Sequence, residues 1–110
     1  MLKESASVKI RTFVPSAQAE KVRQAMGQAG AGTQGQYSNC SSSYKSTGRF
    51  TPGPDAKPAI GQPGQPEEVE EEAIEILCPK DKVKEVIVAL KKVHPYQEPA
   101  IDILPRLEIE

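Results

Sequence analysis

The chain has 110 residues, a length that predicts one domain over residues 1–110. Apolar residues make up 37% of it, Trp is absent, and 8 Gly and 10 Pro are present, so the core is small and much of the chain is loop. The formal net charge is −1 and the Lys and Arg residues are scattered, which argues against a nucleic-acid partner.

The charge is divided unevenly along the chain. Residues 1–58 hold eight Lys or Arg against three Asp or Glu, whereas residues 59–110 hold six against twelve. Such an asymmetry suits a head-to-tail or ring contact between copies of the chain. A thin core also favours a homo-oligomer, because association buries further apolar surface.

The sequence shows no membrane or export signal. No segment approaches the roughly 20 apolar residues that span a membrane, and residues 1–10 lack the apolar run of a signal peptide. We therefore expect a cytoplasmic protein without a membrane partner. In that setting Cys40 and Cys78, which have no CxxC partner, are expected to be reduced thiols.

The first structural unit is a strand followed by a helix. Residues 8–14 alternate apolar and polar side chains, which predicts a strand that ends at Pro15. Ser16 is a candidate N-cap, and apolar residues at helical spacing follow. Gly30 and Gly32 are expected to end this helix, because glycine adopts the left-handed conformation of many helix C-termini.

The second unit repeats this plan. Residues 73–78 predict a strand that ends at Pro79, Asp81 is a candidate N-cap, and an apolar stripe indicates a helix to His94. Residues 100–104 predict a final strand. The repeated order of elements predicts an α+β fold, the ferredoxin-like βαββαβ sandwich.

An insert region, about 37–68, separates the two units. Residues 37–44 and 49–51 are predicted to pair as a hairpin around residues 45–48. Residues 52–68 form a Pro/Gly-rich loop that ends in an acidic run. A loop of this length is usually functional or disordered, and we expect an ordered excursion or lid.

Residues 30–35 read Gly-Ala-Gly-Thr-Gln-Gly and match G-x-G-x-x-G. A dinucleotide site needs a strand before this motif and a helix after it, whereas here a helix precedes it. The glycines can still let the backbone approach a ligand or a neighbouring subunit closely. Cys40 follows this segment and is either a small buried residue or a metal ligand or reactive thiol.

His94, the only histidine, begins the string His-Pro-Tyr-Gln-Glu-Pro. Pro95 and Pro99 make this turn rigid, so that His94, Tyr96 and Glu98 are presented at fixed positions. The imidazole and the carboxylate could bind a cation or act as acid and base; alternatively, His94 is only the C-cap of its helix.

Several motifs together resemble a known family, the PII-like insert domain of the YqfO/YbgI-type (Nif-three-like) proteins. They are, in order, residues 13–15 (FVP), 29–32 (AGAG), 35–40 (GQYSNC), 48–52 (GRFTP), 58–61 (PAIG), Gly64, and 94–100 (HPYQEPA). The resemblance runs from about residue 8 to 107. It implies a PII/CutA-like fold and a trimer.

The same resemblance sets limits on the activity. In the larger relatives a separate domain carries a two-metal site, and that domain is missing here, so no metal-hydrolase activity is carried over. The family usually has Glu where this chain has Gln97, which removes one negative charge from the turn. It also usually has an aromatic residue where Ser42 stands.

The first hypothesis is a trimeric, PII/CutA-like binding or regulatory module whose ligand lies between subunits, near residues 30–40 and 94–98. Its candidate ligand-binding residues are Gly30, Gly32, Gly35, Tyr37, Cys40, His94, Tyr96 and Glu98. The alternative is a single divalent metal ion, copper or zinc, held by His94 with Glu98 or Cys40. A third hypothesis is a small enzyme that uses His94 and Glu98 as an acid–base pair.

Overall fold

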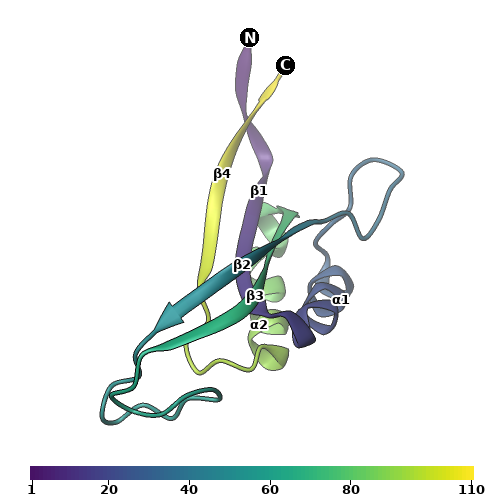
Figure 1. The fold of residues 1–110 in the computed structure, drawn as a ribbon. Coiled ribbons are helices and arrows are strands. Elements are labelled where there is room, and N and C mark those ends of the chain that lie inside the picture. The colour runs from purple at the N-terminus through teal and green to yellow at the C-terminus, as the bar shows by residue number, and fades with distance from the viewer.

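A computed structural model describes all residues, 1–110, and contains four strands, two helices and two short 3-10 turns (Figure 1). The elements are β1 (Leu2–Pro15), η1 (Ser16–Gln18), α1 (Ala19–Ala29), β2 (Ser42–Phe50), β3 (Glu67–Pro79), η2 (Lys80–Lys82), α2 (Val83–Val93) and β4 (Ile101–Ile109). The strand order in the sheet is β2-β3-β1-β4, and every neighbouring pair is antiparallel. This is the predicted ferredoxin-like βαββαβ fold.

The repeat predicted from the sequence is present in detail. Each of β1 and β3 ends at a proline, and one 3-10 turn then leads into an 11-residue helix. The predicted N-caps are wrong, because Ser16 and Asp81 lie inside the 3-10 turns and no side chain caps either helix.

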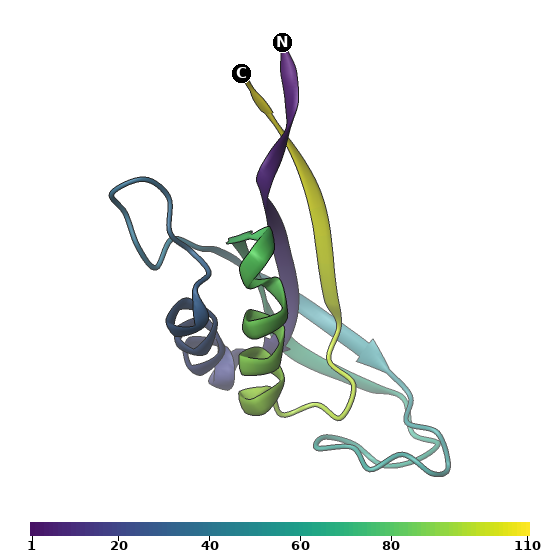
Figure 2. The ribbon, with the colours of Figure 1, turned by 180° about the vertical axis from the view of Figure 1, so that it is seen from behind.

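Both helices cover the same face of the sheet, as Figure 2 shows from behind. The core lies between these layers and contains alternate residues of β1 and β3, such as Ile10 and Ile76, packed against Val22, Met26 and Leu90 of the helices. The alternation arises because successive side chains of a strand point to opposite faces. The other face of the sheet is left without a helical layer.

The helices end as predicted but at opposite ends of the molecule (Figure 1). α1 ends at Gly30, whose φ of 122° favours glycine, and the next residue donates its backbone N–H to the Met26 carbonyl. α2 ends at His94, which donates its own N–H to the Leu90 carbonyl and is extended, and Pro95 prevents continuation.

The predicted hairpin within residues 37–51 is wrong. β2 is one continuous strand through residues 45–48, and it pairs along its whole length with β3, from Ser42 opposite Glu75 to Phe50 opposite Glu67. The acidic run, predicted as the end of a loop, is therefore the first half of β3. The loop between the two strands is shorter than predicted and covers residues 51–66.

β1 and β4 continue beyond the helices as a two-stranded ribbon that carries both chain ends (Figure 1). Leu2 lies opposite Ile109 in the register, and Glu110 donates its N–H to the Met1 carbonyl. An irregularity between Glu4 and Val8 shifts the pairing of β1 with β4. Neither helix is long and apolar enough to cross a membrane.

Candidate functional site

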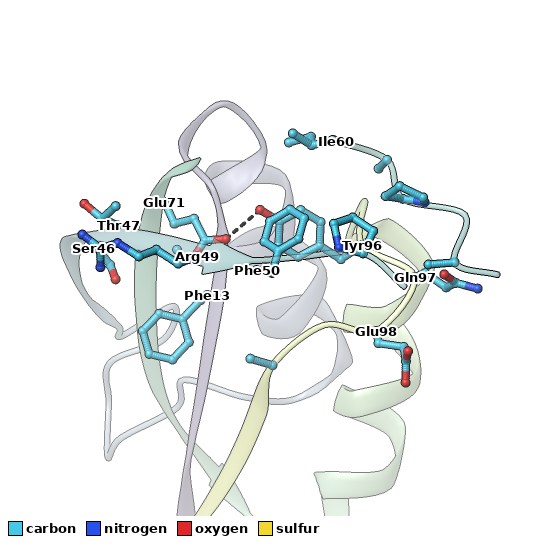
Figure 3. A pocket seen from close by; sticks show the side chains of 16 residues that line it. Phe13, Ser46, Thr47, Arg49, Phe50, Ile60, Glu71, Tyr96, Gln97 and Glu98 are labelled. Carbon is cyan, nitrogen blue, oxygen red and sulfur yellow. Dashed lines mark hydrogen bonds between the residues drawn. The ribbon is translucent and has the colours of Figure 1, made fainter. Parts of the chain in front are cut away.

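A pocket of about 450 Å³ lies where the end of β2, the 51–66 loop and residues 94–100 meet (Figure 3). Its lining comprises Phe13, Ser46, Thr47, Gly48, Arg49, Phe50, Pro52, Ala56, Pro58, Ala59, Ile60, Glu71, Tyr96, Gln97, Glu98 and Ala100. Apolar and aromatic side chains thus surround a few polar groups, which is the usual composition of a small-molecule site.

His94 fixes the turn that forms one wall of this pocket. Its Nε2–H donates to the Phe13 carbonyl oxygen at 2.8 Å, and its Nδ1 accepts the backbone N–H of Tyr96 at 3.1 Å. The ring is buried, and burial lowers the pKa of His94 against the opposing effects of the Phe13 carbonyl and the Glu71 carboxylate. Both nitrogens are engaged, so His94 positions Tyr96.

Tyr96 connects that turn to the sheet. Its hydroxyl donates to Glu71 Oε2 at 2.6 Å, and its ring meets Phe50 edge-on with 5.7 Å between centroids. Burial, together with the adjacent Glu71 carboxylate, raises the pKa of Tyr96, so the phenol stays protonated and remains a donor. The wall of the pocket is consequently held by one hydrogen bond and one ring contact.

Gly48 makes room for the Glu71 carboxylate. A Cβ atom at position 48 would overlap the Glu71 carboxylate, with Oε1 far inside contact distance. Glycine in the interior of a strand commonly marks such a close approach. The absence of a side chain in β2 therefore lets a carboxylate of β3 lie flat across its neighbouring strand.

Gln97 joins the turn to the 51–66 loop. Its Oε1 accepts the backbone N–H of Lys57 at 3.1 Å, and the loop itself is closed by a hydrogen bond from the Gly64 N–H to the Pro52 carbonyl. Gln97 is thus a structural contact here. Glu98 lies at the exposed rim and points away from the hydrogen bond between Tyr96 and Glu71 (Figure 3).

The remaining predicted site residues lie at the other end of the sheet. The Gly32 N–H donates to the Leu77 carbonyl and the Cys40 N–H to the Gly32 carbonyl, each at 2.8 Å. Gln34 and Tyr37 exchange two backbone hydrogen bonds, which form a tight turn around Gly35. Tyr37 is exposed, and Cys40 is half-buried.

The structure therefore divides the predicted site into two groups. The first group is His94, Tyr96 and Glu98, in the turn that lines the pocket with Glu71. The second group is Gly30, Gly32, Gly35, Tyr37 and Cys40, in the segment that is hydrogen-bonded to Leu77. Six residues of extended strand span roughly 20 Å. Within one chain His94 and Cys40 are not brought together, and no three His, Cys, Asp or Glu side chains are grouped so as to hold a metal ion.

Comparison with known proteins gives the same picture of the fold. The chain is 46% identical over 97 residues to the GTP cyclohydrolase 1 type 2 homolog of Bacillus subtilis, a match that covers 88% of this chain and 26% of that protein. A Bacillus cereus protein related to NIF3 superposes with a TM-score of 0.77 at 40% identity, covering 96% of this chain and 26% of that one. No protein-family model matches the chain.

The chain is a homologue of one segment of the NIF3-related proteins. It spans about a quarter of the length of these relatives. The periplasmic divalent cation tolerance protein CutA from Archaeoglobus fulgidus superposes with a TM-score of 0.66 at 20% identity, covering 91% of this chain and 83% of that one. That likeness shows that the chain has a CutA/PII-like fold.

Sequence reasoning missed the residues that other elements contribute to the pocket, above all Phe13, Phe50 and Glu71. The family resemblance carries a signal for three of its parts, since Phe13, residues 48–50 with Pro52, and residues 58–60 belong to its motifs and line the pocket. Glu71 carries no such signal, because it is one of five glutamates in six positions and only the strand register distinguishes it.

Proposed function

We propose that this chain is a single-domain, PII/CutA-like module that binds a small molecule in the pocket beside Tyr96. The observation that carries the proposal is the pocket itself. Its volume of about 450 Å³ falls in the range of small-molecule sites, roughly 300–1,000 Å³. Its walls are joined by the hydrogen bonds from Tyr96 to Glu71 and from Lys57 to Gln97.

The geometry favours binding over acid–base catalysis. A general base needs a free lone pair within reach of its substrate. Nδ1 of His94 already accepts the Tyr96 N–H, Nε2 faces the Phe13 carbonyl, and the ring is buried beneath the turn. Glu98 is exposed at the rim and no hydrogen bond links it to His94.

We further propose that the module works as a homo-oligomer, a trimer. β2 and β4 are the two edges of the sheet and leave backbone groups unpaired on their outer sides. The terminal ribbon exposes Leu2, Leu107 and Ile109, so association would bury apolar surface that one chain leaves in water. In an oligomer, the residues near Tyr96 of one copy and the residues near Cys40 of another copy could also form one site between subunits.

Ligand titration with matched variants tests the binding proposal. Calorimetry against a panel of nucleotides, small metabolites, copper and zinc is expected to find a small-molecule ligand whose binding is lost in Tyr96→Ala. Tyr37→Ala removes the same ring from the segment that is hydrogen-bonded to Leu77 through Gly32, and it serves as the control. Loss of binding in both variants would indicate a site between subunits, and loss in neither would overturn the assignment of the pocket.

The metal hypothesis is tested by the same titration. Copper or zinc binding that disappears in His94→Ala, and in Glu98→Gln or Cys40→Ser, would support the single-ion site. Binding of a small molecule in Tyr96-dependent fashion with no response to either metal would reject it.

A further inference from the structure

The carboxylate of Glu71 stands apart from the other acids of its strand. Glu68, Glu70, Glu72 and Glu75 each form an ion pair, with Arg49, Lys45, Arg23 and Lys9 respectively. Glu71 is the most buried glutamate of the strand, with a relative exposure of 5%, and no Lys, Arg or His pairs with it. A buried carboxylate without a cation is costly, so its position calls for an explanation.

One oxygen of this carboxylate is free. Oε2 accepts the Tyr96 hydroxyl at 2.6 Å, whereas Oε1 has no hydrogen bond from the protein. Because no buried side-chain oxygen is left without a partner, Oε1 is open to the pocket. Oε1 lies over Gly48, and both Glu71 and Gly48 line the pocket. A ligand in the pocket can therefore reach an acceptor that the protein leaves unused.

Two aromatic rings lie beside this carboxylate. Phe50 and Tyr96 line the pocket and are held edge-to-face, and the Tyr96 hydroxyl is bonded to Glu71. A third ring of the lining, Phe13, lies under the Arg11 guanidinium, 5.8 Å from the ring centroid, and is already engaged with a cation. The faces of such rings attract cations, most strongly where water is excluded. Carboxylate and rings thus favour the same kind of ligand.

The one basic residue of the lining does not oppose this preference. Arg49 donates to Glu68 Oε2 at 3.1 Å, is exposed, and extends away from Tyr96 (Figure 3). The other charges of the lining are Glu71 and Glu98. An anionic ligand beside Tyr96 would instead face the Glu71 carboxylate without a compensating cation.

We propose that the pocket takes an organic cation, a protonated amine, a quaternary ammonium or a guanidinium group on a small apolar body. The charged group lies against Glu71 and the rings of Phe50 and Tyr96, and the apolar body contacts Pro52 and Ile60. The inference rests on the proposed binding function and names its ligand class. The apolar lining and the single buried carboxylate suit an organic cation better than a metal ion, which needs several ligands.

Calorimetry on the intact chain tests this with four probes. Agmatine and choline are the cations, 3,3-dimethyl-1-butanol is the neutral isostere of choline, and ATP is the anion. We expect at least one cation to bind, choline to bind about tenfold more tightly than its isostere, and ATP not to compete. Higher salt is expected to weaken the binding of the cation.

Two variants locate the charge. Glu71→Gln keeps a group that can accept the Tyr96 hydroxyl but removes the charge, and is expected to lower cation affinity about tenfold or more. Glu70→Gln makes the same change on the adjacent residue, which points to the other face of the strand and pairs with Lys45. It should leave affinity unchanged. Phe50→Leu, a second variant in case Glu71→Gln does not fold, should weaken choline more than its isostere.

Several results would overturn the inference. The first is that choline and its neutral isostere bind equally, and the second is that a folded Glu71→Gln protein keeps its affinity for the cation. The third is that ATP binds in the pocket, and the fourth is that neither agmatine nor choline binds. In each case a Tyr96-dependent ligand from the broader panel would leave the proposed binding function standing. If no compound of that panel binds in a Tyr96-dependent way, both proposals fail.

Discussion

At the scale of single residues, His94 acts on the pocket through its neutral form. The tautomer with the proton on Nε2 donates to the Phe13 carbonyl, and only an unprotonated Nδ1 can accept the N–H of Tyr96. A second proton would place two donors, Nδ1–H and the Tyr96 N–H, against each other. The turn that carries Tyr96 and Gln97 is therefore stabilised by the uncharged form of His94.

This arrangement predicts a pH dependence of stability. Because burial lowers the pKa of His94 below its ordinary 6.5, the unfolded chain takes up the proton first as pH falls. The free energy of unfolding should therefore rise with pH from the acidic side and level off above about pH 6.5. Urea denaturation across that range measures it. His94→Asn, which cannot titrate, should flatten the step; a step that persists in this variant would assign it to another group.

Gly48 gives a second prediction at this scale. In Gly48→Ala the new Cβ would displace the Glu71 carboxylate and break its bond to Tyr96, so we expect a loss of about 1–3 kcal/mol in the free energy of unfolding. Urea denaturation gives the value. Gly53→Ala is the matched control, since no atom lies within 4 Å of the position of its Cβ. Equal effects of the two substitutions would contradict a special role for Gly48.

At the scale of elements, the strands and helices that could be predicted from the sequence are those whose apolar side chains recur at a regular spacing. β1 and the second half of β3 alternate cleanly, and each helix carries an apolar stripe, so their presence and order were predictable. β2 was predicted as two strands of a hairpin, because Lys45, Thr47 and Gly48 resemble a turn. Pairing with β3 keeps these residues in an extended strand, because Lys45 and Arg49 form ion pairs with Glu70 and Glu68 across the two strands.

The candidate site was predictable only where a single segment makes it. Tyr96 and Glu98 belong to a local, proline-framed string, whereas Glu71 reaches the pocket through the register that sets it opposite Pro15 and Ser46. The first hypothesis placed residues 30–40 and 94–98 at one site between subunits, and each of these segments follows a helix. The two helices run antiparallel in space, so their ends lie at opposite ends of the sheet.

The contribution of α2 to the core can be measured with a matched pair of truncations. Leu90 is fully buried, and Leu90→Ala should cost about 2–5 kcal/mol of the free energy of unfolding through lost burial and a new cavity. Val88 lies two residues earlier with 48% relative exposure, and Val88→Ala should change the same quantity by less than about 0.5 kcal/mol. Urea or thermal unfolding compares them. A large effect at Val88 would indicate that the exposed side of α2 is covered by another subunit.

At the scale of the whole molecule, the unevenly distributed charges of the two halves largely pair with one another inside the chain. Basic residues of the first half pair with acids of the second half in Lys9–Glu75, Arg11–Asp102, Arg23–Glu72, Lys45–Glu70 and Arg49–Glu68. The asymmetry therefore reflects how β2 and β1 lie beside β3 and β4. It supports a contact between copies less than the exposed apolar residues do.

Those apolar residues allow the proposed assembly to be tested. The ribbon formed by the ends of β1 and β4 exposes Leu107 and Ile109, and Leu2 lies opposite Ile109 in the register. If this ribbon is buried between subunits, the double substitution Leu107→Lys and Ile109→Lys should shift the mass in solution to that of one chain, because burying charges in an apolar contact is unfavourable. Light scattering after size exclusion measures the mass.

Glu108→Lys, on the opposite face of the same strand, should leave the oligomer intact. An unsubstituted chain that is monomeric at every concentration would reject the homo-oligomer, and an oligomer that survives the double substitution would place its interface elsewhere on the sheet.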